Sequence, residues 1–322
     1  MAYEIDPTQP LDEEIRRIAK EQIRKIEKSL GEGGEDPHEA IHDARKRFKK
    51  LRGLIRLVKD ADADFYDAEN AQFRDTAREL SVVRDKAALV EAVDALGERF
   101  KDEVKVAPFR TVRDRLVAQR DAAAAEEGDL APTLARVREV LRDARERLDR
   151  LTFPKRADPA KIVAAGIART HRRGRKALRL TEKQPQAEIF HDLRKRAKYA
   201  SMHFRLIAPL WPEVFRPMAE AAKGIGDDLG LDHDYAVFRA ALAADPKTFG
   251  SHEELTVVLG LMDRRQSELR QSARDAARRL YAETPDALEG RVRRLYRARR
   301  TVAARTAAAP VPAPGDDDHS IG

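Results

Sequence analysis

Two stretches of the chain combine a histidine with a row of cationic side chains. Residues 42–49 read HDARKRFK and residues 191–198 read HDLRKRAK, so six of eight positions are identical at an offset of 149 residues. Guanidinium groups hold phosphate oxygens bidentately, ammonium groups act as point charges, and a neutral histidine can donate one ring N–H. Such a row favours binding of an anion rather than attack by a nucleophile.

In a helix, about 100° per residue places these cations on one face. The cations on the face of His42 are Arg45, Lys46, Lys49 and Arg56, with Arg52 slightly further round. The opposite face carries the apolar residues Phe48, Leu51, Ile55 and Val58. The second copy repeats the arrangement, with His191, Arg194, Lys195, Lys198 and Arg205 on one face. Each stretch therefore predicts an amphipathic helix with a cationic outer face and an apolar inner one.

The charge in the first of these helices is strongly unbalanced. Residues 37–59 hold eight Lys or Arg and two Asp or Glu. Like charges four residues apart repel by a few tenths of a kcal/mol, so the row is unfavourable unless an anion offsets it. A further basic face follows in the second half, at Arg169, Arg172, Arg173, Lys176 and Arg179. If the rows face a shared groove, an extended polyanion would fit it.

Helix-forming residues, breakers and apolar spacing predict helices throughout the chain. The expected helices cover about residues 11–30, 36–60, 63–80, 84–97, 103–127, 131–150, 160–182, 186–208, 213–229, 233–244, 251–282 and 286–301. Asp36 is the expected N-cap of the second helix, before Pro37 at its first position. Residues 152–159 are expected to link two parts, and the proline- and aspartate-rich end is expected to be disordered.

The repeat extends beyond the basic stretches, because the same offset aligns Leu80 with Leu229 and Asp85 with Asp234. We therefore predict an all-α fold of two homologous helical halves related by a pseudo-two-fold axis. The expected divisions are residues 1–152, residues 153–305 and a tail at 306–322. Asp85 and Asp234 are expected to cap helices or to hold a basic side chain in position.

Composition narrows the function classes. The 322 residues carry a formal net charge of +7 and no cysteine, which excludes disulfides and cysteine-based metal sites. No apolar run approaches 18 residues, so no membrane span is expected. These features predict a cytoplasmic protein with anionic partners.

The duplicated His-Asp-x-Arg-Lys-Arg-x-Lys pattern resembles the CHAD family, the conserved-histidine α-helical domains. The segments 80–85 and 229–234 resemble its second signature, a Leu-Gly-containing turn leading into Asp. The resemblance covers roughly residues 10–300 and implies two antiparallel helical bundles around a basic groove or pore that binds inorganic polyphosphate. Family members are often fused to a triphosphate-tunnel domain. No alternating Glu-x-Glu-x-Lys strand is present here, so we expect a stand-alone member.

The resemblance also implies binding residues. They are His42, Arg45, Lys46, Lys49, Lys50, His191, Arg194, Lys195 and Lys198. Tyr199 stands where the first copy has Lys50, so the second copy is one cation poorer. From the cationic faces we add Arg52, Arg56, Arg205, Arg172, Arg173 and Lys176 to the predicted polyphosphate site. We expect binding without catalysis, no cofactor, no metal, and association with polyphosphate granules.

Three alternatives stay open. Residues 38–42 fit the HExxH zinc-peptidase pattern, but Arg45 and Lys46 would repel Zn²⁺ and the second copy has Ala187 in place of His38. Nucleic acid is the stronger rival, because it shares the phosphate chemistry. Against it, Phe, Tyr and Trp make up only 6% of the chain, few for base stacking. A polyphosphate-processing enzyme would need a metal or a general base in the groove, and no convincing set is present.

Overall fold

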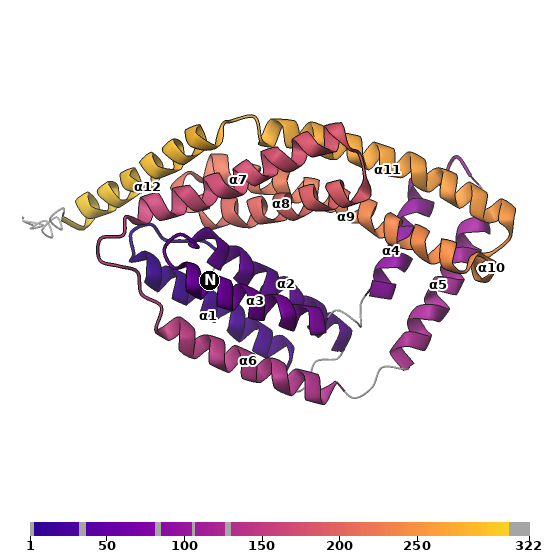
Figure 1. The fold of residues 1–322 in the computed structure, drawn as a ribbon, viewed down its shortest axis with the longest axis horizontal. Coiled ribbons are helices and arrows are strands. Elements are labelled where there is room, and N and C mark those ends of the chain that lie inside the picture. The colour runs from indigo at the N-terminus through magenta and orange to yellow at the C-terminus, as the bar shows by residue number, and fades with distance from the viewer. Residues whose placement is uncertain (1–2, 32–36, 81–84, 105–106, 126–129, 309–322) are drawn as a thin grey trace, which may run out of the picture.

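The computed structural model describes residues 3–31, 37–80, 85–104, 107–125 and 130–308. Side chains are not described at 37–38, 85–87, 107–108, 123–125, 247 and 303–308. The described residues form helices and no strand, which confirms the predicted all-α class. The α-helices are α1 (Leu11–Ser29), α2 (Pro37–Leu57), α3 (Ala63–Glu79), α4 (Asp85–Arg99), α5 (Ala107–Ala125), α6 (Ala131–Asp149), α7 (Pro159–Lys183), α8 (Ala187–Leu206), α9 (Pro212–Ala244), α10 (Pro246–Phe249), α11 (His252–Leu280) and α12 (Pro285–Ala308). A 3₁₀ turn, η1, covers Ala208–Leu210 (Figure 1).

The helices form where apolar residues recur at helical spacing and where the ends are capped. In α2, Phe48, Leu51 and Ile55 are buried at one per turn. At the start of α11, the Ser251 hydroxyl accepts from the Glu254 N–H, and Glu254 bonds back to the Ser251 N–H. This reciprocal capping satisfies two amide donors that the first turn would otherwise leave unpaired.

Helix α9 differs from its prediction, and the short helix α10 was not predicted. The segments 213–229 and 233–244, predicted as two helices with a turn between them, are one continuous helix, α9. The turn prediction rested on Gly230, which is buried inside the helix against the guanidinium of Arg194. A glycine in a helix interior costs about 1 kcal/mol relative to alanine, and close packing against α8 explains its presence.

The end of the chain also needs a correction. Helix α12 runs to Ala308, so residues 306–308 are helical rather than part of the tail predicted to be disordered. The rest of that tail, 309–322, lies outside the described residues, as does the predicted N-cap Asp36. No helix in the described ranges is both long enough and apolar enough to cross a membrane.

The helix order follows the repeat. The first residues of α7, α8 and α9 lie 148, 150 and 149 residues after those of α1, α2 and α3. The halves differ where α9 continues without interruption, because the matching part of the first half is divided between α3 and α4. The repeated stretches thus place the two basic rows on equivalent helices, α2 and α8.

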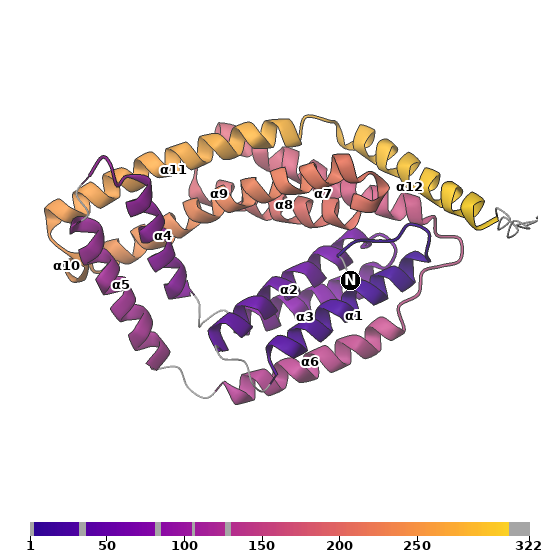
Figure 2. The same ribbon diagram turned by 180° about the vertical axis from the view of Figure 1, so that it is seen from behind.

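Two hydrophobic cores hold the helices together, and neither follows the predicted boundary at residue 152. The larger core joins α1, α2, α3 and α6 with α7, α8, α11, α12 and the first part of α9. The smaller joins α4 and α5 with α10, α11 and the last part of α9. Helices α4 and α5 therefore pack on elements of the second half (Figures 1 and 2). The boundary itself stays a prediction about the repeats.

Helices α2 and α8 meet at their C-terminal parts. A Cβ atom added at Gly53 would lie 2.7 Å from the Met202 sulfur, so a larger residue would require the flexible Met202 side chain to shift. Nearby, Nε2 of the buried His203 lies 3.0 Å from the Gly53 carbonyl oxygen. Burial lowers the pKa of His203 to about 3, so the ring is neutral and can donate to that carbonyl. The crossing fixes how the two basic rows face each other.

Candidate functional site: a basic cleft between α2, α8 and α9

A cleft of about 420 Å³ lies where α2, α8 and α9 adjoin. Eight Lys or Arg side chains and two Asp side chains are among its lining residues. The lining residues are Tyr3, His42, Asp43, Lys46, Arg47, Lys49, Lys50, Arg194, Lys198, Ser201, Met202, Arg205, Lys223 and Asp227. The basic faces of both repeats thus contribute to one concave surface.

The centre of the cleft brings equivalent residues of the two repeats together. Desolvation, together with the positive charges of Lys198, Arg45, Arg194 and Arg52, lowers the pKa of Lys49 to about 8. Lys49 as a whole is nonetheless exposed to solvent, and repulsion from these neighbours acts on its ammonium. The cations are therefore concentrated near one point, and an anion bound there would relieve their mutual repulsion.

Few carboxylates offset this charge. Asp43 accepts hydrogen bonds from Arg47 at 2.8 Å and from Ser29 at 3.0 Å. Burial tends to raise the pKa of Asp43, but these bonds outweigh it and leave the pKa below its usual value. At the α9 rim, Lys223 pairs with Asp227 at 2.9 Å. In the described part of the chain, no carboxylate lies within ion-pairing distance of Lys46 or Lys49.

Helix α9 supports the cationic row of α8, a role that the sequence reasoning missed. A Cβ at Gly226 would lie 3.1 Å from Lys198 Cγ, and one at Gly230 would lie 3.3 Å from an Arg194 nitrogen. The two glycines are four residues apart, so they share one face of α9 and leave room for the two side chains. The signal available in the sequence was this Gly-x-x-x-Gly spacing inside a helical pattern.

Burial acts on Arg194 as it does on Lys49. Its Nε atom is buried without a hydrogen-bond acceptor. Burial lowers the pKa of Arg194, opposed by the negative charges of Asp234 and Asp227. Burial in turn raises the pKa of Asp234, opposed first by Arg194. Asp234 therefore lies close enough to act on a basic side chain electrostatically, as expected, whereas the side chain of Asp85 is not among those described.

The histidine of the second row packs against another histidine. The rings of His191 and His233 are 4.4 Å apart between centroids. Burial, together with the neighbouring His233, Lys195 and Arg194, lowers the pKa of His191 to about 4. At neutral pH, His191 is therefore uncharged and can act as a hydrogen-bond donor rather than a cation. His233, which received no role from the sequence, contributes to this state.

The predicted site residues divide into groups. The cleft brings together His42, Lys46, Lys49, Lys50, Arg194, Lys198 and Arg205. Arg45 is among the charges that act on Lys49, and Lys195 among those that act on His191. Near the cleft, Arg205 pairs with Glu220 at 2.6 Å and Lys195 with Asp192 at 3.5 Å. The binding role of all these residues stays a prediction.

The remaining predicted residues lie outside the cleft. Arg52 donates to Asn70 of α3 at 3.2 Å. On α7, Arg172 pairs with Asp286 at 3.3 Å and Lys176 is exposed. Arg56 and Arg173 line a separate small pocket on the α7 side of α8. Helix periodicity alone could not separate Arg52 and Arg56 from the cleft, since they share a face of α2 with residues that line it, and the periodicity of α7 does not show which helices its basic face adjoins.

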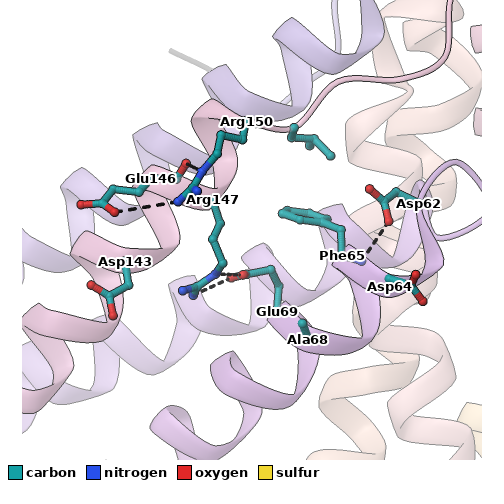
Figure 3. Close-up of a pocket in the computed structure, with 10 residues that line it drawn as sticks. Asp62, Asp64, Phe65, Ala68, Glu69, Asp143, Glu146, Arg147 and Arg150 are labelled. Carbon is teal, nitrogen blue, oxygen red and sulfur yellow. Dashed lines mark hydrogen bonds and ion pairs between the residues drawn. The ribbon is translucent and has the colours of Figure 1, made fainter.

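A larger cavity of about 750 Å³ lies elsewhere, between α3 and α6. Asp62, Asp64, Glu69, Asp143 and Glu146 line it with Arg147 and Arg150 (Figure 3). The buried Glu69 is paired with Arg147, and Asp62 caps α3 by accepting from the Phe65 N–H at 2.9 Å. Its lining is mainly acidic, and these contacts are structural, so this cavity does not suit an anion.

The described side chains include only part of the HExxH zinc-peptidase pattern. The side chain of His38 lies outside them. No group of three or more His, Asp or Glu side chains with metal-binding geometry occurs among the residues that were described. The chemistry of the cleft is therefore that of a cation-rich surface with one histidine, suited to binding phosphate oxygens.

Comparison with known proteins identifies the family of this chain. A family model described as CHAD domain matches residues 17–243, more than two thirds of the 322-residue chain. No curated protein matches the chain. The matched range runs from α1 to the end of α9 and includes both basic rows and the helix that supports the second one. The chain therefore belongs to the CHAD family.

Proposed function

We propose that this protein binds inorganic polyphosphate in the cleft between α2, α8 and α9, without catalysis. The observation that carries the proposal is the charge of the cleft, with eight Lys or Arg against two Asp, drawn from both repeats. The family to which the chain belongs is linked to polyphosphate binding. The cytoplasm, at polyphosphate granules, is the corresponding place of action.

The length of the cationic row favours a chain over a single compact anion. From Arg194 to Arg205 the α8 row extends over eleven residues, about 16 Å at 1.5 Å per residue. Cations three or four residues apart on a helix are about 5–6 Å from one another. A linear polymer with a charge on every unit can contact several of them at once, whereas one phosphate cannot.

Binding without catalysis is supported by the state of the two carboxylates in the cleft. Asp43 is engaged by Arg47, and Asp227 by Lys223. A carboxylate whose oxygens are held in an ion pair is a poor general base, because the paired cation competes with the proton that a base must accept. The cleft offers cations and hydrogen-bond donors for binding.

We further propose that a pseudo-two-fold axis passes through the α2–α8 crossing. Lys49 and Lys198 are equivalent in the repeat and are electrostatic neighbours, and Gly53 and Met202 are equivalent and in contact. Arg56 lies 4.4 Å from the Tyr199 ring, while the equivalent pair, Lys50 and Arg205, interact through their charges. Exchanged contacts of this kind are expected of a two-fold arrangement.

The proposed cleft is tested by reversing its two central charges. We expect the K49E/K198E double variant to bind polyphosphate about tenfold or more weakly, because charge-assisted hydrogen bonds are lost and repulsion replaces them. The matched control is K161E/R179E, which makes the same charge change on exposed positions of α7. Calorimetry measures affinity, and circular dichroism checks that helix content is unchanged. Equal affinity of the two folded variants would refute the cleft as the site.

Two measurements test the ligand and the absence of catalysis. Competition with DNA tests whether polyphosphate is the preferred ligand, and a gel that resolves polyphosphate chain length tests for hydrolysis. At fixed salt, polyphosphate should displace single-stranded and duplex DNA from the protein, because Tyr3 is the one Phe, Tyr or Trp among the described residues that line the cleft, which gives bases little to stack on. Tighter binding of DNA would replace the proposal with nucleic-acid binding.

The chain length of polyphosphate tests for catalysis. With Mg²⁺ present, polyphosphate incubated with the protein should keep its chain length, and shortening would show an enzyme instead.

A further inference from the structure

A second cationic pocket lies on the α7 side of α8, apart from the cleft. It has room for about one water-sized group, at about 10 Å³. Its lining residues are Arg56, Arg169, Thr170, Arg173, Arg196 and Tyr199, none of which lines the cleft. Four arginines from α2, α7 and α8 therefore meet around a space for a single small group.

The positive charge of this pocket is only partly neutralised. Arg169 is paired with Asp60, and Arg196 with Asp192 at 2.8 Å. No carboxylate among the described residues lies within ion-pairing distance of Arg56 or Arg173. Burial lowers the pKa of Arg173, and the charges of Arg196, Arg56 and Arg169 lower it further. Two guanidinium charges in the pocket are thus left to an external anion.

Arg56 lines this pocket and is held by contacts with two tyrosine rings and an asparagine. Its guanidinium lies 4.4 Å from the Tyr199 ring and 5.4 Å from the Tyr66 ring, and one terminal nitrogen donates to Asn70 at 3.4 Å. Its Nε atom is buried and has no acceptor. A buried donor without an acceptor is costly, and more so when the group is charged. An oxygen atom supplied by a ligand would remove that cost.

We propose that this pocket binds one phosphate group bearing terminal oxygens, either free phosphate or the end of a phosphate-containing chain. Guanidinium groups bind phosphate bidentately, and several together match its multiple oxygens better than they match a carboxylate. A terminal phosphate carries close to two negative charges at pH 7, as many as the two arginines leave unpaired. The size of the pocket admits one oxygen, with the rest of the group held at the mouth by the exposed Arg173.

This inference goes beyond the cleft and can fail independently of it. The probe is inorganic phosphate, followed through the Nε–H resonance of Arg56, which the R56K variant assigns. We expect a saturable shift with a millimolar or tighter dissociation constant. R173E should weaken binding by about tenfold or more, since it inverts a charge that would face the phosphate. R179E, an equal charge change elsewhere on α7, should stay within about twofold because long-range effects are screened.

Two results would overturn the pocket: no saturable shift in the wild type, or equal weakening by R173E and R179E. Short polyphosphates with free or ester-blocked ends then identify the source of the phosphate. Displacement by free-ended chains alone assigns chain ends to the pocket, and displacement by neither assigns free phosphate. Equal displacement by both would refute a site for terminal phosphate, because blocked chains offer only internal groups. If the K49E/K198E variant binds inorganic phosphate, the proposal for this pocket stands even if the cleft proposal fails.

Discussion

At the scale of single residues, Lys49 shows how its surroundings change the protonation of a cleft residue. Its pKa of about 8 follows from burial and from four surrounding cations. A lysine in this state is partly neutral in mildly alkaline solution and becomes fully charged when an anion binds beside it. Protonation and anion binding at this residue should therefore be linked.

Proton uptake on binding tests this linkage. At pH 8.5, polyphosphate binding to the wild-type protein should take up protons, and affinity should fall as pH rises through about 8. The K49R variant should bind without this proton uptake, since arginine stays charged. Calorimetry in two buffers of different ionisation enthalpy measures the protons taken up. Undiminished uptake by K49R would assign the effect to another group.

The same shift sets the sign of a stability change. The unfolded chain protonates Lys49 below about 10.5, whereas the folded protein does so only below about 8. Between these values the unfolded state binds more protons, so this residue makes the free energy of unfolding rise with pH. Below pH 8 the unfavourable charge is fully present, and bound polyanion offsets it.

At the scale of elements, α9 connects fold and site. Its buried glycines Gly226 and Gly230 leave space for Lys198 and Arg194, while the exposed Gly224 contacts nothing within 4 Å of an added Cβ. The glycines of α9 therefore differ in role: Gly226 and Gly230 leave space for cationic side chains, and Gly224 does not. At Gly226 the space is filled by the stem of a cleft lysine, so a larger residue would shift that lysine.

Alanine at these two positions separates helix propensity from the role in the site. We expect G224A to raise the free energy of unfolding by about 0.8–1.0 kcal/mol, with polyphosphate affinity unchanged. G226A should gain less stability, because its methyl group displaces Lys198 from a 3.1 Å approach, and should weaken binding. Chemical denaturation and calorimetry measure the two effects. A G226A protein with full affinity would show that Lys198 does not need this support.

At the scale of the whole molecule, charge is distributed unevenly. The net charge is +7 over 322 residues, yet a single cleft gathers eight cations against two carboxylates. Elsewhere, ion pairs such as Arg99–Glu268 and Arg264–Glu103 join the first half of the chain to α11. The packing of α4 on α11 thus brings acidic and basic side chains together.

Salt dependence tests this concentration of charge. By analogy with single-stranded nucleic acids, the logarithm of the polyphosphate binding constant should fall linearly with that of salt concentration, by about 0.7 per phosphate neutralised. Removing one cleft cation with K198M should reduce the slope by about 0.7, the contribution of one phosphate contact. The control R179M, outside the cleft, should keep the wild-type slope. A slope near zero would indicate a small ligand held by specific contacts instead.

Much of the fold could be predicted from sequence because helices depend on local spacing. Phe48, Phe190 and Phe204, which lie off the cationic faces, are buried in the core as their periodicity indicates. The repeat at an offset of 149 identified α2 and α8 as equivalent helices. The resemblance to the CHAD family, too, was carried by short motifs, and the match of the family model over residues 17–243 confirms it. These features involve residues a few positions apart, so the chain itself specifies them.

Only the tertiary structure decided what the helices face. Gly230 indicated a turn, but packing against Arg194 keeps α9 helical through it. Lys49 and Arg56 share a face of α2, yet the α2–α8 crossing places Lys49 in the cleft and Arg56 in the second cationic pocket. Close approaches such as Gly53 to Met202 depend on residues 149 positions apart, and periodicity within one helix carries no information about its neighbours.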